Sequence, residues 1–160
     1  MAEARSRAGR VFGALALAMA ATVMVAVMIS QRLADGPVEP VWDRDACAHC
    51  HMHVGDPAFA SQIQHRDGRV LHYDDPGCLL EALGTVRDEV HAVWFHHLRE
   101  DRWLLGDDAG FVRTDPTPMG YGLGAVDRGT TGALSLEEAL ATVSNAPPVG
   151  HSEDGHVDVR

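Results

Sequence analysis

Residues 59–83, which read F-A-S-Q-I-Q-H-R-D-G-R-V-L-H-Y-D-D-P-G-C-L-L-E-A-L, decide the fold. Residues 59–64 predict a strand and residues 69–73 predict its partner. The Asp-Gly step at residues 67–68 lies between them and is a strong signal for a tight turn between antiparallel strands. The stretch therefore predicts a β-hairpin that leads directly into a helix.

That helix has a clear start. Asp75 can serve as its N-cap, and Pro76 then occupies the first helical position, where proline is favoured. The apolar residues that follow share one face of the helix, namely Leu79, Leu80 and Leu83. A second helix is predicted for residues 135–143, because Ser135 and Glu138 have the spacing of a capping box.

Four further segments predict strands, at residues 90–95, 102–105, 111–113 and 121–126. The order is strand, strand, helix, strand, and then more strands and a helix. This order predicts a small α+β domain with a mainly antiparallel sheet and short helices. We place the domain at residues 47–143, and predict that the tail at residues 144–160, rich in Pro, Gly, His and acidic residues, is disordered.

The N-terminal part predicts a membrane anchor. Residues 11–31 form an uncharged apolar run up to Gln31, about the length that crosses a bilayer as a helix. Three arginines in residues 1–10 place that end in the cytoplasm and the domain outside. A cleaved signal peptide is the alternative, with a candidate site at residues 18–20. Residues 32–46 are interpreted as a linker.

Composition excludes one large class of partner. The formal net charge is −10, and all 13 basic residues are arginines spread along the chain. A nucleic-acid surface needs clustered cations, so no nucleic-acid partner is expected. Three cysteines are too few, and odd in number, for a small domain that depends on disulfides.

The chemistry is concentrated in residues 47–53, which read C-A-H-C-H-M-H. Six of these seven side chains can bind a metal. Thiolate and thioether sulfurs are soft ligands that favour Cu(I), and Met52 argues against zinc, which rarely uses a thioether. Cys47, Cys50 and Met52 are the candidate sulfur ligands, and His51 is a candidate nitrogen ligand. Cys78, in contrast, is expected to be a small packed residue.

Met119 is a candidate ligand from a distant part of the chain. It lies in the segment P-M-G-Y-G at residues 118–122, where proline stiffens the approach and glycines remove bulk. Such a loop can present a thioether in a fixed position.

Two other functions fit the same residues. Residues 47–51 match C-x-x-C-H, the attachment motif for haem c, with His51 and Met119 as candidate iron ligands for electron transfer. The Cys47/Cys50 pair also resembles the C-x-x-C of a thiol–disulfide oxidoreductase, although no βαβ unit precedes it.

Three pieces in chain order also resemble a known family. They are C-A-H-C-H-M with D-P-A-F-A, then D-G-R-V with D-D-P-G-C-L-L, and then T-P-M-G-Y-G. Together they are similar to the NosL family of nitrous oxide reductase accessory proteins. The resemblance implies two small ββαβ units and a Cu(I) chaperone that works outside the cytoplasm. Its ligands would be Cys50, Met52 and Met119, with Cys47 as the other cysteine of the motif.

The resemblance also implies partners: a copper enzyme client such as nitrous oxide reductase, and a membrane ABC-type complex. The chain departs from the family pattern in three ways. His51 stands where the family motif has glycine, a spanning segment replaces the lipid-bearing cysteine, and the region after Val126 is short. The sequence thus predicts a membrane-anchored, extracytoplasmic Cu(I) metallochaperone that is not an enzyme.

Overall fold

The computed structural model describes residues 15–27 and 33–145. The chain divides into two compact units, residues 1–33 and residues 34–160. In the first unit, residues 15–27 form a helix. Within the described segments, no helix has the length and apolar character that crossing a membrane requires. The rest of the predicted anchor at 11–31, all of residues 1–10 and most of the predicted tail lie outside the described residues.

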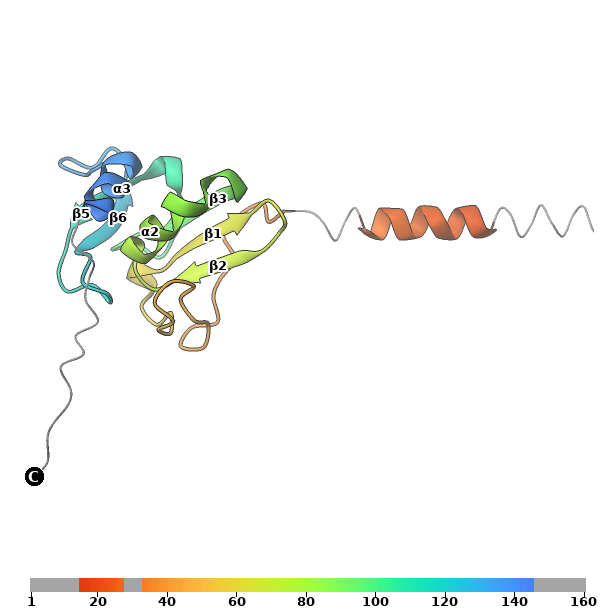
Figure 1. Ribbon diagram of the computed structural model, residues 1–160, viewed down its shortest axis with the longest axis horizontal. Coiled ribbons are helices and arrows are strands. Elements are labelled where there is room, and N and C mark those ends of the chain that lie inside the picture. Colours follow the sequence, from red (N-terminus) through yellow and green to blue (C-terminus); the bar gives the residue numbers. More distant parts are fainter. Residues whose placement is uncertain (1–14, 28–32, 146–160) are drawn as a thin grey trace, which may run out of the picture. The chain divides into compact units, whose positions relative to one another are not determined.

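The larger of the two described sheets in the second unit is antiparallel and has four strands (Figure 1). Its strands are β1 (Ser61–His65), β2 (Val70–Tyr73), β3 (Val90–His96) and β4 (Trp103–Leu105), in the spatial order β2-β1-β3-β4. The predicted hairpin is confirmed, because Ser61 pairs with Tyr73 and Gln64 with Val70. The sheet therefore brings the start of β1 next to the end of β2.

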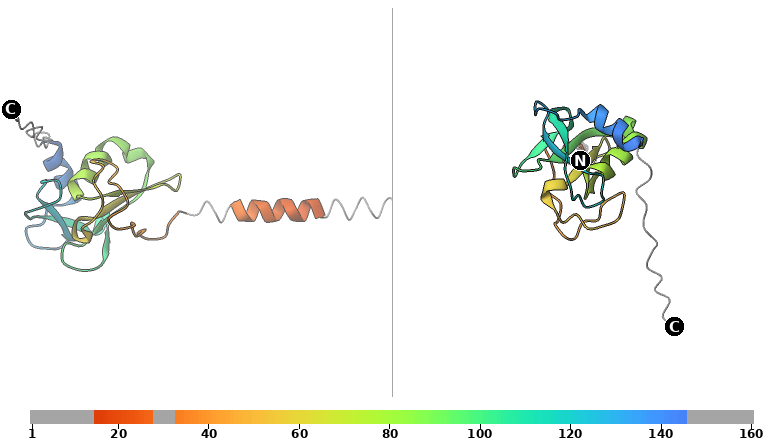
Figure 2. Two further views of the ribbon diagram at one scale, coloured as in Figure 1. Left: turned by 90° about the horizontal axis from the view of Figure 1, so that it is seen from below. Right: turned by 90° about the vertical axis from the view of Figure 1, so that its left-hand side faces the viewer.

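The remaining strands, β5 (Ala109–Arg113) and β6 (Leu123–Asp127), form a separate antiparallel pair. Two helices, α2 (Pro76–Val86) and α3 (Leu136–Ser144), pack against each other (Figure 1 and Figure 2). Three 3₁₀ turns complete the described elements: η1 (Pro57–Phe59), η2 (Arg87–Glu89) and η3 (Gly106–Asp108). The predicted α+β class with short helices and antiparallel strands is confirmed.

The two sheets and two helices share one core. Buried residues come from β1, α2, β3, β5, β6 and α3, and they include Ile63, Leu79, Leu80, Phe95, Phe111, Leu123 and Leu140. The rings of Phe95 and Phe111 meet edge to face with centroids 4.8 Å apart, a favourable geometry that joins the two sheets. Burying these side chains stabilises the domain by roughly 1.5–3 kcal/mol for each large one.

The first strand starts later than the sequence suggested. Phe59, predicted as strand, belongs to η1, where the Asp56 side chain accepts a hydrogen bond from the amide of Ala58 at 3.0 Å. Pro57 at the first position of this turn favours it further, because its fixed φ suits a helical start. The local capping therefore overrides the strand preference of the apolar residues.

Residues 36–41, which we call the strap, are hydrogen-bonded to the sheet. The Gln62 side-chain amide donates to the Val38 carbonyl and its oxygen accepts from the Val38 amide, both at 3.0 Å. Gln64 donates to the Gly36 carbonyl at 2.7 Å, and the Trp103 indole donates to Glu39 at 2.6 Å. The segment predicted as a linker, residues 32–46, is thus bonded to the domain from Gly36 onward.

Candidate metal centre

A tight loop carries the first two cysteines. The Cys47 amide donates to the Met52 carbonyl at 2.7 Å, and the His51 amide donates to the Cys47 carbonyl at 3.0 Å. The Ala48 amide donates to the His72 carbonyl on β2 at 2.9 Å, which fixes the loop against the end of the hairpin. His51 has a φ of 64°, a left-handed conformation that favours glycine. The turn thus needs the conformation that glycine adopts most easily.

The sulfur atoms of Cys47, Cys50 and Cys78 converge. All three lie within 4.8 Å of one another, a separation at which one metal ion can be shared. Cys78 reaches the site because it is the third residue of α2, and α2 starts directly after β2, beside the cysteine loop. Cys47 and Cys78 are fully buried, whereas Cys50 is half-buried. The three-cysteine cluster therefore has one side that solvent can reach.

Sequence reasoning did not assign Cys78 to the site, and the expectation that it only fills space was incomplete. Its sulfur is packed, but it is packed against the other two thiols. A signal was present in the hairpin itself. A hairpin of residues 61–73 returns the chain to its starting side, so a cysteine in the first turn of the next helix comes close to whatever precedes the first strand.

The three thiols have different proton affinities. A hydrogen bond from the Cys78 thiol, assisted by the backbone amides of Cys50, Asp74 and His49, lowers the pKa of Cys47 to about 4, although burial opposes this. The same hydrogen bond and burial raise the pKa of Cys78. Burial raises the pKa of Cys50 as well. One thiolate stabilised by a neighbouring thiol and by backbone amides is a strong ligand for a soft cation.

Two acidic side chains, Asp74 and Asp75, lie close enough to this cluster to act on it. Asp75 is fully buried and caps α2, accepting from the Gly77 amide at 2.8 Å. Burial raises the pKa of both Asp75 and Asp74, and each acts electrostatically on Cys47. The charge environment therefore favours a bound cation and disfavours additional negative charge.

Met119 lies in a loop that is fastened to the same helix end. Its backbone amide donates to the second carboxylate oxygen of Asp75 at 3.0 Å, so one residue caps α2 and holds the loop. The half-buried Met119 side chain packs against the core cluster that includes Cys47 and Cys78. Tyr121 in the same loop covers Gly77, where even a methyl group would collide with its ring. The structure thus brings the Met119 loop to the helix turn that carries Cys78.

Met52 and His51 have a different environment. Met52 is 58% exposed and His51 is also exposed, although both belong to the cysteine loop. The structure therefore gathers the buried Cys47 and Cys78 with the half-buried Cys50 and leaves Met52 and His51 exposed at the surface.

The loop, the helix and the Met119 loop are also linked at the surface. His49 Nε2 lies 2.8 Å from Glu81 Oε2, and Glu81 is on α2. The Tyr121 hydroxyl also bonds to Glu81, and burial together with this bond raises the pKa of Tyr121. Glu81 thus connects both loops that carry candidate ligands.

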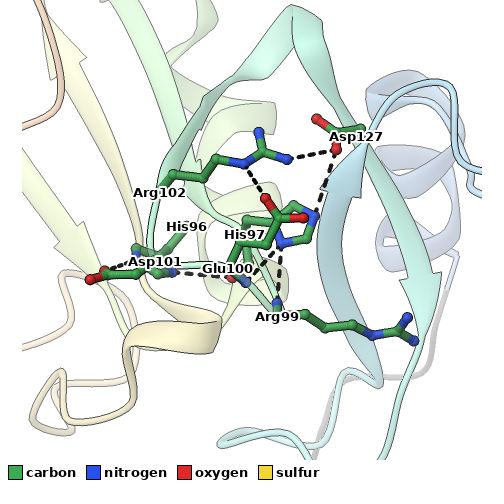
Figure 3. A network of polar contacts seen from close by, with 7 residues as sticks. All are labelled: His96, His97, Arg99, Glu100, Asp101, Arg102 and Asp127. Carbon is green, nitrogen blue, oxygen red and sulfur yellow. Dashed lines mark hydrogen bonds and ion pairs between the residues drawn. The ribbon is translucent and has the colours of Figure 1, made fainter.

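A second group, His97, Glu100 and Asp127, also has ligand atoms within 4.8 Å of one another. Figure 3 shows that Arg102 lies among them, and its guanidinium donates to Glu100 at 2.7 Å and to Asp127 at 2.6 Å. His97 Nδ1 accepts from two backbone amides at 3.1 and 3.0 Å, so the proton of the neutral ring is on Nε2. The Arg102 guanidinium already neutralises the two carboxylates, and His97 has no free nitrogen lone pair for a metal ion. We therefore interpret this group as one that stabilises the turn and not as a metal site.

Comparison of the chain with protein-family models, with curated proteins and with solved structures gives no match.

Proposed function

We propose that this chain is a membrane-anchored, extracytoplasmic metallochaperone whose cargo is Cu(I). The observation that carries the proposal is the convergence of sulfur ligands from separate segments on a buried, acidic site with one accessible side. Soft sulfur ligands in this number favour Cu(I) over harder ions. The half-exposed Cys50 offers an incoming ligand a place to begin exchange, so the protein stores and transfers the ion without catalysing a reaction.

For Cu(I) we propose Cys47 and Cys50 as thiolate ligands and Met119 as a neutral third ligand. Two thiolates and one Cu(I) leave a single negative charge, and a thioether adds none, which suits a site next to Asp74 and Asp75. Met52 and His51, which are exposed, would act at the entrance, where they can take part in transfer.

The client and the membrane partner rest on the resemblance to the NosL family. On that basis we propose a copper enzyme such as nitrous oxide reductase as client and a membrane ABC-type complex as partner. The succession of β1, β2, α2 and β3 agrees with one ββαβ unit, and β5, β6 and α3 would form a shortened second unit.

The geometry gives less support to the two alternatives. Covalent attachment of haem would need room for the macrocycle beside Cys47, whose side chain is fully buried against Cys78. A dithiol oxidoreductase needs an exposed thiol of low pKa. Here the thiol of low pKa, Cys47, is buried, and the more exposed Cys50 has a raised pKa.

The test is an anaerobic titration of the reduced full-length protein with Cu(I) in competition with a colorimetric chelator. We expect one Cu(I) per chain, and losses of affinity of about tenfold or more in Cys47→Ser, Cys50→Ser and Met119→Ala, since tenfold corresponds to ~1.4 kcal/mol of binding free energy. Met24→Ala in the N-terminal helix is the matched control, and its affinity should be unchanged. Unchanged affinity in both Cys50→Ser and Met119→Ala would refute the assignment.

A further inference from the structure

We propose that the cluster of Cys47, Cys50 and Cys78 also binds trivalent arsenic, as a neutral complex in which all three sulfurs bond to one arsenic atom. Arsenic and Cu(I) would share Cys47 and Cys50 and differ in the third protein residue that binds them. That residue is Cys78 for arsenic and Met119 for copper. The inference uses the site of the proposed function but does not depend on copper transfer.

The geometry of the cluster suits this ligand. Trivalent arsenic forms three bonds to sulfur in a shallow pyramid, with a lone pair in place of a fourth ligand. The three sulfur atoms are already within 4.8 Å of one another, so they surround one central atom without distant parts of the chain having to move. Because Cys50 is only half-buried, an incoming molecule can reach the cluster from that side.

The net charge of the three-sulfur complex distinguishes trivalent arsenic from metal cations at this site. Three thiolates around Cu(I) would carry a net charge of −2, and three around a divalent ion would carry −1. Three thiolates around trivalent arsenic are neutral. Asp74 and Asp75 act electrostatically on these cysteines, and unpaired charge in the protein interior is strongly unfavourable. A complex that uses all three sulfurs, two of them fully buried, is therefore favoured when it is neutral.

The chemical step balances without an additional reagent. Arsenous acid, As(OH)₃, reacts with the thiols of Cys50 and Cys78, the Cys47 thiolate and one proton from solvent to give As(S–Cys)₃ and three water molecules. Two S–H and three As–O bonds break, while three As–S and three O–H bonds form, and arsenic stays trivalent throughout. None of the three cysteines is in a disulfide, so all three sulfurs can react.

The test is native mass spectrometry of the reduced, metal-free full-length protein after incubation with sodium arsenite. For the wild type we expect an adduct that gains one arsenic atom and loses three hydrogens, with no oxygen retained. Cys78→Ser has two of the three thiols, so its adduct should keep one hydroxyl on arsenic and should bind arsenite at least tenfold more weakly. Phenylarsine oxide, which needs only two thiols, should bind both proteins and serves as the control that the Cys47/Cys50 pair is reduced and reactive.

Copper binding is measured on the same samples, so the two proposals can fail separately. Met119→Ala should lose affinity for Cu(I) and keep the three-sulfur arsenic adduct. A wild-type adduct that retains a hydroxyl group, the absence of any adduct, or equal arsenite affinity in wild type and Cys78→Ser would overturn the inference. The mass of the wild-type adduct alone counts the sulfur ligands, so this result does not require any variant to fold.

Discussion

Gly77→Ala tests whether the fit between α2 and the Tyr121 ring holds the Met119 loop against the cysteine helix. A methyl group at Gly77 would lie 1.9 Å from Cγ and 2.4 Å from Cβ of Tyr121. Ordinary carbon contacts are ~3.5–4 Å, so the ring must move by roughly 1.5–2 Å. Overpacking of this kind costs ~1–3 kcal/mol, and the better helix propensity of alanine returns at most ~1 kcal/mol.

Gly84→Ala is the matched control, because it lies in the same helix and a methyl group there has no neighbour within 4 Å. It should stabilise the protein by about 0.5–1 kcal/mol. The free energies of unfolding of the two variants, measured in urea, should therefore differ by ~1–3 kcal/mol, which is the cost of the collision. Gly77→Ala should also weaken Cu(I) binding, while Gly84→Ala should not. Equal stability of the two variants would refute the packing argument.

Three further predictions concern single side chains. His51→Gly should be more stable than His51→Ala by about 1 kcal/mol in thermal unfolding, because the φ of 64° suits glycine. The pKa of Cys47 is lowered from 9.0 to about 4, so its thiolate contributes stability that is complete above about pH 9 and is lost as pH falls towards 4. The advantage of metal-free wild type over Cys47→Ser in urea should therefore grow between about pH 5 and pH 8, and a constant difference would contradict it. His97→Ala leaves two backbone amides without their acceptor and should cost ~1–3 kcal/mol, compared with a small effect for the exposed His91→Ala.

Local signals predicted most of the fold. The Asp-Gly turn, the Asp75 cap and the Ser135/Glu138 capping box each act within a few residues, and the structure has a hairpin and two helices at those places. The split into a four-stranded and a two-stranded sheet was not predicted. Pairing between strands far apart in the sequence depends on packing, such as the contact of Phe95 with Phe111, which no local pattern reveals.

The candidate site was predicted in part for the same reason. Clustering along the chain identified Cys47 and Cys50, but it also included Met52, which the loop turns outward to 58% exposure. Cys78 was missed because its role depends on the hairpin and helix together bringing it back to the loop. A search for donors in the first turn of a helix that follows a predicted hairpin would have found it.

The strap has a practical consequence for anyone who expresses this domain alone. The metal-binding motif suggests a truncation that begins just before Cys47, yet such a fragment would remove the partners of Gln62 and Gln64, two almost fully buried amides in the central strand. Each amide stripped of its acceptor would cost roughly 1–3 kcal/mol. A fragment that begins at Ala34 is longer, keeps every one of these bonds and should remain folded.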